Sequence, residues 1–257
     1  MPFVSIANQK IFYSESGSPE NLPIIFVHGA AANHLVWGFQ MRALADIAHA
    51  IALDLPGHGR SDPPGRNNIN DYSNVVLGLL AALDVDHAVI VGHSMGGAIA
   101  QKVALVQPDR VAGLVLIGTG ARLRVMPAIL DGVLSDVNQI AKIVVDNSYA
   151  STLDPAMRQR AIAEFVACPP QITHDDFVAC NTFDILARVG DIHAPTLVIC
   201  GKQDNMAPFK YSEFLASKIP NARLVPVEKA GHSVMIERAD EVNHQLSEFI
   251  TRLRWSI

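Results

Sequence analysis

The sequence predicts an α/β fold in which a mostly parallel eight-stranded sheet has helices on both faces and a helical cap inserted after the sixth strand. Short apolar runs alternate with longer amphipathic segments up to Gly120. Helical patterns alone occupy the next segment, and the alternation returns after Pro195. The chain has 257 residues, 49% of them hydrophobic, which is enough to bury one large sheet on both faces.

The predicted strands are short and apolar. The first two form a hairpin, and the third is a nearly continuous apolar run, which is typical of a strand buried on both faces of a parallel sheet. The regular alternation with helices implies right-handed crossovers between parallel strands. The eight predicted strands cover 3–7, 10–16, 23–29, 50–59, 87–94, 111–120, 196–204 and 222–228.

The predicted helices have apolar residues at helical spacing. Those that cover the sheet are 37–46, 71–85, 95–108, 209–219 and 239–254. Those of the inserted block are 127–145, 154–166 and 173–189. A block of helices that interrupts the alternation is interpreted as a cap over the strand ends. We therefore predict a core domain of 1–121 and 188–257 and a helical cap of 122–187.

Charge and cysteine content argue against several classes of function. The formal net charge is −5 with no basic run, which disfavours nucleic acid and anionic membranes as partners. Cys168, Cys180 and Cys200 lack metal-ligand spacing, so we expect reduced packing residues in a reducing compartment. No segment resembles an export signal, and no apolar run approaches the ~20 residues that cross a bilayer. We expect a cytoplasmic monomer or homodimer without metal or cofactor.

The stretch "GHSMGG" at 92–97 stands where a predicted strand becomes a helix. Gly92, Ser94 and Gly96 match the G-x-S-x-G nucleophile elbow, whose turn is so tight that side chains beside the serine would collide. Ser94 then stands at the carboxyl end of a strand, where open α/β sheets bind ligands, and beside the positive end of a helix. A glycine-rich turn with an N-cap serine fits the same five residues. A phosphate-binding turn is the other alternative, but the stretch has no Walker-type Lys-Ser/Thr pair and no G-x-G-x-x-G.

A serine nucleophile needs a base, and the base needs an orienting acid. For this elbow the partners follow in the order acid, then histidine. Asp204 ends one predicted strand, and His232 follows the next. Taken alone, such an aspartate is often a turn residue and such a histidine a solvated loop residue. Their order and their places favour Ser94, Asp204 and His232 as a catalytic triad.

An oxyanion hole needs two N–H donors. One is expected from Met95, directly after the nucleophile, and the other from the loop after the third strand. In that loop Gly29 permits a tight turn, so we predict the backbone N–H of Ala30, with Ala31 as the alternative.

Five motifs together resemble those of the α/β-hydrolase family over essentially the whole chain. They are "HGAAANHLVW" at 28–37, "DLPGHGRSD" at 54–62, "GHSMGG" at 92–97, "PTLVICGKQDNMAP" at 195–208 and "AGHSVMIERADEVN" at 230–243. They are similar to the branch that holds small carboxylesterases, 3-oxoadipate enol-lactone hydrolases, carbon–carbon bond hydrolases and cofactor-free haloperoxidases. The resemblance implies Ser94 as nucleophile, His232 as general base and Asp204 as its orienter. Members of this fold with dehalogenase or epoxide hydrolase activity carry aspartate at the elbow.

Other polar residues near these motifs are assigned supporting roles. We expect His28 to hydrogen-bond the backbone of the oxyanion loop. His93 is expected to pack away from Ser94, because neighbouring side chains of a strand point to opposite sides. Asp54, Gly57, Gly59 and Asp62 are expected to shape a turn.

The substrate pocket is predicted from apolar side chains of the cap and of nearby loops. The candidates are Trp37, Met126, Phe165, Phe183, Met206 and Val234, each of which fits a core position as well. Arg122 or Arg124, where the cap leaves the sheet, would suit a substrate that carries a carboxylate.

The sequence thus predicts a hydrolase of small, mainly apolar carboxylic esters, with a small-molecule ester as its partner. An enol-lactone hydrolase or a carbon–carbon bond hydrolase with the same triad is the alternative. A non-catalytic receptor or scaffold is a third possibility, which the intact triad disfavours. The motifs alone do not choose the substrate, because that choice lies in the cap.

Overall fold

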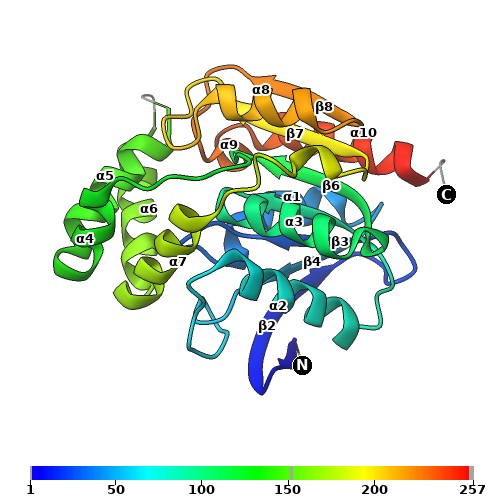
Figure 1. Cartoon of the computed structure of the whole chain (residues 1–257), viewed down its shortest axis with the longest axis horizontal. Helices are drawn as coiled ribbons and strands as arrows, with labels where there is room; N and C mark the ends of the chain where they lie inside the picture. The colour runs from blue at the N-terminus through cyan, green and yellow to red at the C-terminus, as the bar shows by residue number, and fades with distance from the viewer. Residues whose placement is uncertain (1, 151–152, 255–257) are drawn as a thin grey trace.

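The computed structural model describes residues 2–150 and 153–254 (Figure 1). At its centre is one sheet in the strand order β1-β2-β4-β3-β5-β6-β7-β8. The strands are β1 (Phe3–Ile6), β2 (Gln9–Ser16), β3 (Pro23–Val27), β4 (His49–Leu53), β5 (Ala88–His93), β6 (Val111–Ile117), β7 (Thr196–Gly201) and β8 (Ala222–Val227). Strand β2 pairs antiparallel with β1 and β4, and the other neighbouring pairs of this sheet are parallel. The predicted eight-stranded, mostly parallel sheet is confirmed.

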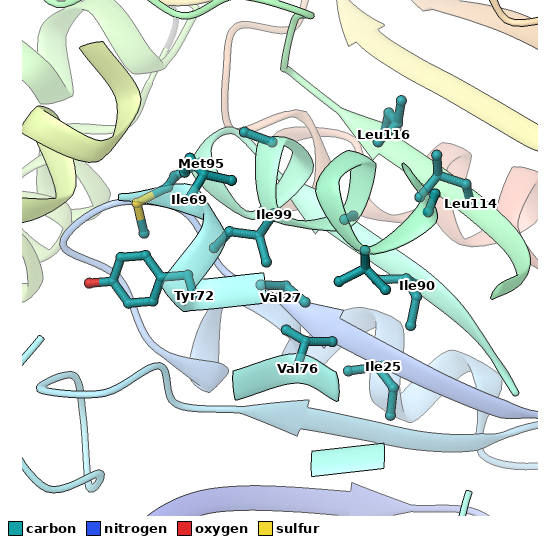
Figure 2. Close-up of a cluster of buried hydrophobic side chains, with 14 of the residues drawn as sticks. Ile25, Val27, Ile69, Tyr72, Val76, Ile90, Met95, Ile99, Leu114 and Leu116 are labelled. Carbon is teal, nitrogen blue, oxygen red and sulfur yellow. The ribbon is translucent and has the colours of Figure 1, made fainter. Parts of the chain in front are cut away.

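Successive side chains of the central strands point to opposite faces of the sheet, and both faces are covered. On β3, Ile25 and Val27 belong to a first core cluster, whereas Ile24 and Phe26 belong to a second. All four are completely buried. Figure 2 shows the first cluster, in which Ile99 of a covering helix lies among the strand side chains. This burial explains why the strands are nearly continuous apolar runs.

Helices on either side of the sheet complete the two clusters. The first cluster is covered by α2 (Ile69–Ala82), α3 (Met95–Val106) and α8 (Phe209–Lys218). The second is covered by α1 (Gly38–Leu44), the short α9 (Val234–Glu237) and α10 (Ala239–Arg254). Short 3₁₀ helices occur at η1 (His34–Trp37), η2 (Pro108–Arg110) and η3 (Val189–Asp191). Within the described residues, no helix combines the length and the apolar character that crossing a membrane requires.

Four helices lie between β6 and β7: α4 (Pro127–Ser135), α5 (Val137–Ser148), α6 (Pro155–Ala167) and α7 (Pro170–Thr182). Figure 1 shows them together at one end of the molecule. They share a third apolar cluster, to which Ala31 of the loop after β3 contributes. The predicted helical insertion after the sixth strand is confirmed, and the cap boundaries 122 and 187 stay a prediction.

The first predicted helix of the insertion, 127–145, is two helices. The chain breaks at Asp136, whose side chain accepts a hydrogen bond from the N–H of Gln139 at 3.0 Å. This aspartate is the N-cap of α5, and a capping residue begins a helix rather than continuing one.

The last predicted helix of the insertion, 173–189, starts earlier and ends seven residues sooner, since α7 ends at Thr182. Phe183 leaves the helix in an extended conformation and is buried in the first core cluster. Asp184 then forms an antiparallel bridge with Arg122, which joins the two ends of the insertion. Burial in the sheet's core therefore decides where this helix stops.

Candidate active site

Ser94 lies at the junction of β5 and α3. Its φ of +53° is in the left-handed region, which strains any residue other than glycine. A Cβ at Gly92 would lie 2.1 Å from the carbonyl oxygen of Gly96, and a Cβ at Gly96 would lie 2.1 Å from that of Val27. Glycine is required at both places, at Gly92 by the turn itself and at Gly96 by the neighbouring strand β3.

Asp204 and His232 lie in the loops after β7 and β8 and form a buried pair. His232 Nδ1 lies 2.9 Å from Asp204 Oδ2. The other carboxylate oxygen, Oδ1, accepts hydrogen bonds from the N–H groups of Met206 and Ala207 at 2.8 and 2.7 Å. Because an ionised carboxylate only accepts, it holds the proton of the imidazole at Nδ1 and leaves Nε2 as the acceptor.

Ser94 and His232 line the same cavity, which has a volume of about 130 Å³. Its wall is mainly apolar and comes from both parts of the molecule. Val144 and Phe165 of the inserted helices and Met206 of the core are among the side chains that line it. A hydroxyl, an imidazole acceptor and an apolar wall therefore meet at one place. The sequence motifs predict that the two polar groups meet, but they do not predict the apolar wall.

The loop after β3 borders the same cavity with Ala30. A Cβ at Gly29 would lie 3.2 Å from the Cβ of Ser94, so this loop approaches the elbow closely. The N–H of Ala31 donates to the carboxylate of Asp176 at 2.9 Å, so it is already engaged. Of the two alternatives for the second oxyanion donor, the geometry favours Ala30.

His28 holds this loop in the way that the sequence predicts. Its Nδ1 donates to the carbonyl oxygen of Gly29 at 2.8 Å, and its Nε2 accepts from the N–H of Leu55 at 3.0 Å. Burial, reinforced by the nearby charge of His58, lowers the pKa of His28 to about 4, so the ring is neutral at pH 7. Since the C=O and N–H of a trans peptide point in opposite directions, the bond to Gly29 also orients the N–H of Ala30.

His93 differs from its predicted orientation. It lines the cavity beside Ser94, its ring lies 4.6 Å from that of His232, and its Nε2 donates to the carbonyl oxygen of His232 at 3.0 Å. Burial, with a further contribution from His232, holds the pKa of His93 well below 6.5. The strained elbow turns the chain out of the strand alternation, and the neutral ring supports the backbone of His232.

The loop after β4 is structural, as its composition predicts. The Asp54 carboxylate accepts from the N–H and Nδ1 of His34 at 2.7 and 2.8 Å and from the N–H of Arg60 at 2.9 Å. Gly59 has a φ of +52°, and a Cβ there would collide with this carboxylate. Gly57 is also left-handed, at +81°. The predicted strand 50–59 therefore ends at Leu53, where this loop begins.

Two of the six predicted pocket residues, Phe165 and Met206, line the cavity. Trp37 is completely buried against Phe26, with ring centroids 5.0 Å apart, and Val234 belongs to the same core cluster. These two positions are corrected from pocket to core because their side chains point toward the sheet.

The other two pocket candidates are corrected as well. Phe183 is buried in the first core cluster, and Met126 is 59% exposed on the surface. Arg122 and Arg124 are about half exposed and approach Asp184 at 3.9 and 3.4 Å, so they lie outside the cavity wall. An apolar periodicity marks the buried side of a helix without distinguishing a core from a cavity.

A second cavity of about 280 Å³ continues outward from the first. The two share Val36, Tyr149, Ala161, Glu164 and Ile236. The outer cavity lies between η1, α1 and α6, and its other lining side chains are both apolar and basic. They include the exposed Leu35, Phe39 and Met157, together with Arg42 and Arg160.

The inserted helices are hydrogen-bonded to the loop of His232. Glu237 accepts from the N–H of Gly231 and from the N–H of Ala150, both at 2.8 Å. Ser233 donates its N–H to the carbonyl oxygen of Ser148 at 2.9 Å. Burial raises the pKa of Glu237, although the two N–H groups oppose that shift. The end of α5 and the histidine loop are therefore held as one unit.

Comparison with known proteins places this arrangement in a family. Residues 23–239 match the model of the alpha/beta hydrolase fold. The dihydrolipoyllysine-residue acetyltransferase component of the acetoin cleaving system of Pseudomonas putida is 31% identical over 269 residues, covering 96% of this chain and 68% of that protein.

Two solved structures extend the likeness. A thermophilic esterase is 32% identical with a TM-score of 0.88, and the match covers 98% of this chain and 97% of the esterase. The enol-lactonase from Burkholderia xenovorans LB400 is 25% identical with a TM-score of 0.93, over 97% of this chain and 100% of the enol-lactonase. Both likenesses cover the sheet and the inserted helices together. The chain belongs to the α/β-hydrolase family.

Proposed function

We propose that the protein is a serine hydrolase of small, mainly apolar carboxylic esters, in which Ser94, His232 and Asp204 act as a catalytic triad. One observation carries the proposal. A serine on a strained elbow and an imidazole held by a buried carboxylate line one mainly apolar cavity. The likeness to a thermophilic esterase supports the same assignment.

In the proposed reaction, Nε2 of His232 takes the hydroxyl proton of Ser94 while Oγ bonds to the ester carbonyl carbon. The negative charge that develops on the carbonyl oxygen is stabilised by the N–H groups of Ala30 and Met95. The bond to the alcohol then breaks, and His232 gives its proton to the departing alkoxide. Water attacks the acyl-enzyme by the same route and releases the acid and the serine. These steps use only groups of the chain and water.

The shape of the two cavities supports small acyl groups and suggests where larger ones extend. The inner cavity, at about 130 Å³, is the smaller, and Val144, Phe165 and Phe177 restrict it. The outer cavity, at about 280 Å³, is open to the remote end of a longer substrate. We propose that the inserted helices act as a cap that selects the substrate in this way.

The test is the release of p-nitrophenol from acetate, butyrate, octanoate and palmitate esters by the wild type and by Ser94→Ala. We expect turnover that is highest for short chains and is lost in the variant, because the hydroxyl is the nucleophile. Ser135→Ala, a serine at the end of α4, is the matched control and keeps full activity. An active Ser94→Ala would refute the proposal.

A second candidate activity is the opening of an enol-lactone with the same triad, which the likeness to an enol-lactonase favours. Cleavage of a carbon–carbon bond next to a ketone belongs to the same alternative. A panel of lactones and ring-cleavage diketones, assayed beside the simple esters, separates the three. A value of kcat/KM that is higher for lactones by more than tenfold would replace the ester proposal.

A further inference from the structure

A buried carboxylate of the inserted helices contacts the oxyanion loop. Asp176, on α7, is completely buried and accepts three hydrogen bonds. Its Oδ2 accepts from the N–H of Ala31 at 2.9 Å and from Nε2 of His58 at 2.8 Å, and its Oδ1 accepts from the hydroxyl of Tyr72 at 2.6 Å. The three donors come from three separate segments of the core, so this one side chain joins α7 to all of them.

The partners of Asp176 are themselves fixed. Nδ1 of His58 donates to the carbonyl oxygen of Pro56 at 3.0 Å, so both ring nitrogens are donors and the ring is an imidazolium. Although burial opposes that charge, Asp176 raises the pKa of His58 well above 6.5. Figure 2 shows Tyr72 at the edge of the core cluster, with its hydroxyl directed away from the other labelled side chains. A rigid set of donors therefore holds the carboxylate in one position.

Ala31 needs such a partner because its backbone is strained. Its φ is +54°, in the left-handed region that residues with a Cβ rarely adopt. The peptide before Ala31 is held by Asp176, and the peptide before Ala30 is held by the bond from His28 to Gly29. Two successive peptides of the oxyanion loop are thus oriented by hydrogen bonds, one from the core and one from the inserted helices.

We propose that Asp176 is a positioning residue for oxyanion stabilisation, which holds the N–H of Ala31 so that the N–H of Ala30 faces the cavity at Ser94. The inference rests on the proposed acyl transfer at Ser94. The inserted helices then have a second role besides selecting the substrate, because they complete the geometry of the oxyanion hole. Asp176 acts through the loop and does not touch the reacting atoms.

The experiment compares Asp176→Ala, Asp176→Asn and Tyr72→Phe with the wild type in p-nitrophenyl butyrate hydrolysis. Loss of one oxyanion donor costs about 10²–10³ in kcat, so we expect its misplacement in Asp176→Ala to lower kcat about 10- to 100-fold with KM nearly unchanged. Asp176→Asn keeps an acceptor oxygen for Ala31 and restores kcat to within a few-fold. Tyr72→Phe loses the bond to Oδ1 but keeps that to Ala31, so we expect a smaller loss of kcat than in Asp176→Ala.

An inhibitor distinguishes the proposed positioning role of Asp176 from a purely structural role. An aryl trifluoromethyl ketone adds to the serine as a tetrahedral oxyanion, so its affinity should fall in Asp176→Ala by the same factor as kcat/KM. Unchanged ketone affinity, an unchanged kcat, or an equal loss in Tyr72→Phe at equal melting temperature would overturn the inference. If Asp176→Ala does not fold, the comparison is made in a His58→Gln background, where no buried cation is left unpaired.

A fluorophosphonate probe keeps this test separate from the choice of substrate. The probe forms a bond between Oγ of Ser94 and phosphorus, fluoride leaves, and the serine proton passes to His232, so labelling needs the oxyanion hole but no particular ester. A labelled wild type that hydrolyses no ester refutes the proposed substrate alone, and the labelling rate then replaces kcat in the comparison of variants. A wild type that is neither labelled nor active refutes both proposals.

Discussion

At the scale of single residues, the site depends on backbone conformations that the side chains alone do not favour. Ser94 and Ala31 both have positive φ, a conformation that costs about 1–3 kcal/mol at each residue and persists only where the surrounding structure imposes it. At Ser94 the two neighbouring glycines permit the strained turn, and at Ala31 hydrogen bonds hold the strained backbone. Strain at both positions of one cavity is consistent with a preorganised site, in which few groups have to move during the reaction.

The glycine at the second elbow position gives the first prediction at this scale. Gly96→Ala would place a Cβ 2.1 Å from the carbonyl oxygen of Val27, so we expect a loss of about 3 kcal/mol or more in the free energy of unfolding. Gly38→Ala is the control, because no atom lies within 4 Å of its Cβ position and the residue is helical. That variant should gain about 0.5–1 kcal/mol. Urea unfolding of both variants checks the pair, and equal stabilities would contradict the stated cause.

Sequence predicts the polar centre well at this scale and the apolar wall poorly. Ser94, Asp204 and His232 stand in motifs whose order is constrained by the turn and by the strand ends, so their convergence follows from the pattern. Trp37 is predicted for the pocket but lies in the core. The sequence around an apolar residue near a site does not distinguish a pocket position from a core position. Asp176 is one acid among several of the insertion, and only its complete burial distinguishes it.

At the scale of elements, both cavities are lined by α6 and η1, and the larger one is lined by α1 as well. The strands and core helices follow from the alternation of apolar runs, but the inserted helices were predicted less accurately. A capping bond at Asp136 and the burial of Phe183 set their ends. Such tertiary contacts override helical periodicity, which continues past both points. The geometry of the inserted helices is therefore set by their packing.

Ala161 on α6 lines both cavities and gives the prediction at this scale. Ala161→Trp would fill space that the two cavities share, so we expect kcat/KM for the octanoate ester to fall about tenfold or more and that for the acetate ester to fall much less. Leu134→Trp, on the exposed side of α4, is the control and leaves both values unchanged. Equal losses for the two esters in Ala161→Trp would mean that longer chains do not use the outer cavity.

At the scale of the whole molecule, the buried histidines link stability to pH. Burial and the nearby charge of His58 lower the pKa of His28 to about 4 in the folded protein, although Asp54 and Asp176 oppose that shift, and the pKa is about 6.5 in the unfolded chain. Between these values only the unfolded chain takes up the proton, so His28 contributes stability above pH 6.5 that is lost as the pH falls toward 4. The full loss is on the order of 3 kcal/mol. His58, whose pKa is raised by Asp176 against the effect of burial, contributes with the opposite sign and loses its contribution as the pH rises through that raised pKa.

The measurement is thermal or urea unfolding at intervals from pH 7.5 to pH 4. We expect the wild type to lose stability steadily below pH 6.5, with a shallower loss in His28→Gln, whose side chain does not titrate. His87→Gln is the matched control, since His87 follows an exposed loop before β5 and its replacement should leave the slope unchanged. Equal slopes in the wild type and His28→Gln would exclude His28 as a source of the pH dependence.

The bonds between the inserted helices and the core limit how this protein can be redesigned. A chimera that receives a foreign segment in place of α4 to α6 exchanges cavity walls such as Val144 and Phe165 and keeps Asp176. A chimera that also exchanges α7 leaves the buried His58 cation without its carboxylate partner and removes the acceptor of the Ala31 N–H. The foreign segment would have to supply an acid of its own at that place. If the inserted helices select the substrate as proposed, the useful boundary for such an exchange lies before Pro170, between α6 and α7.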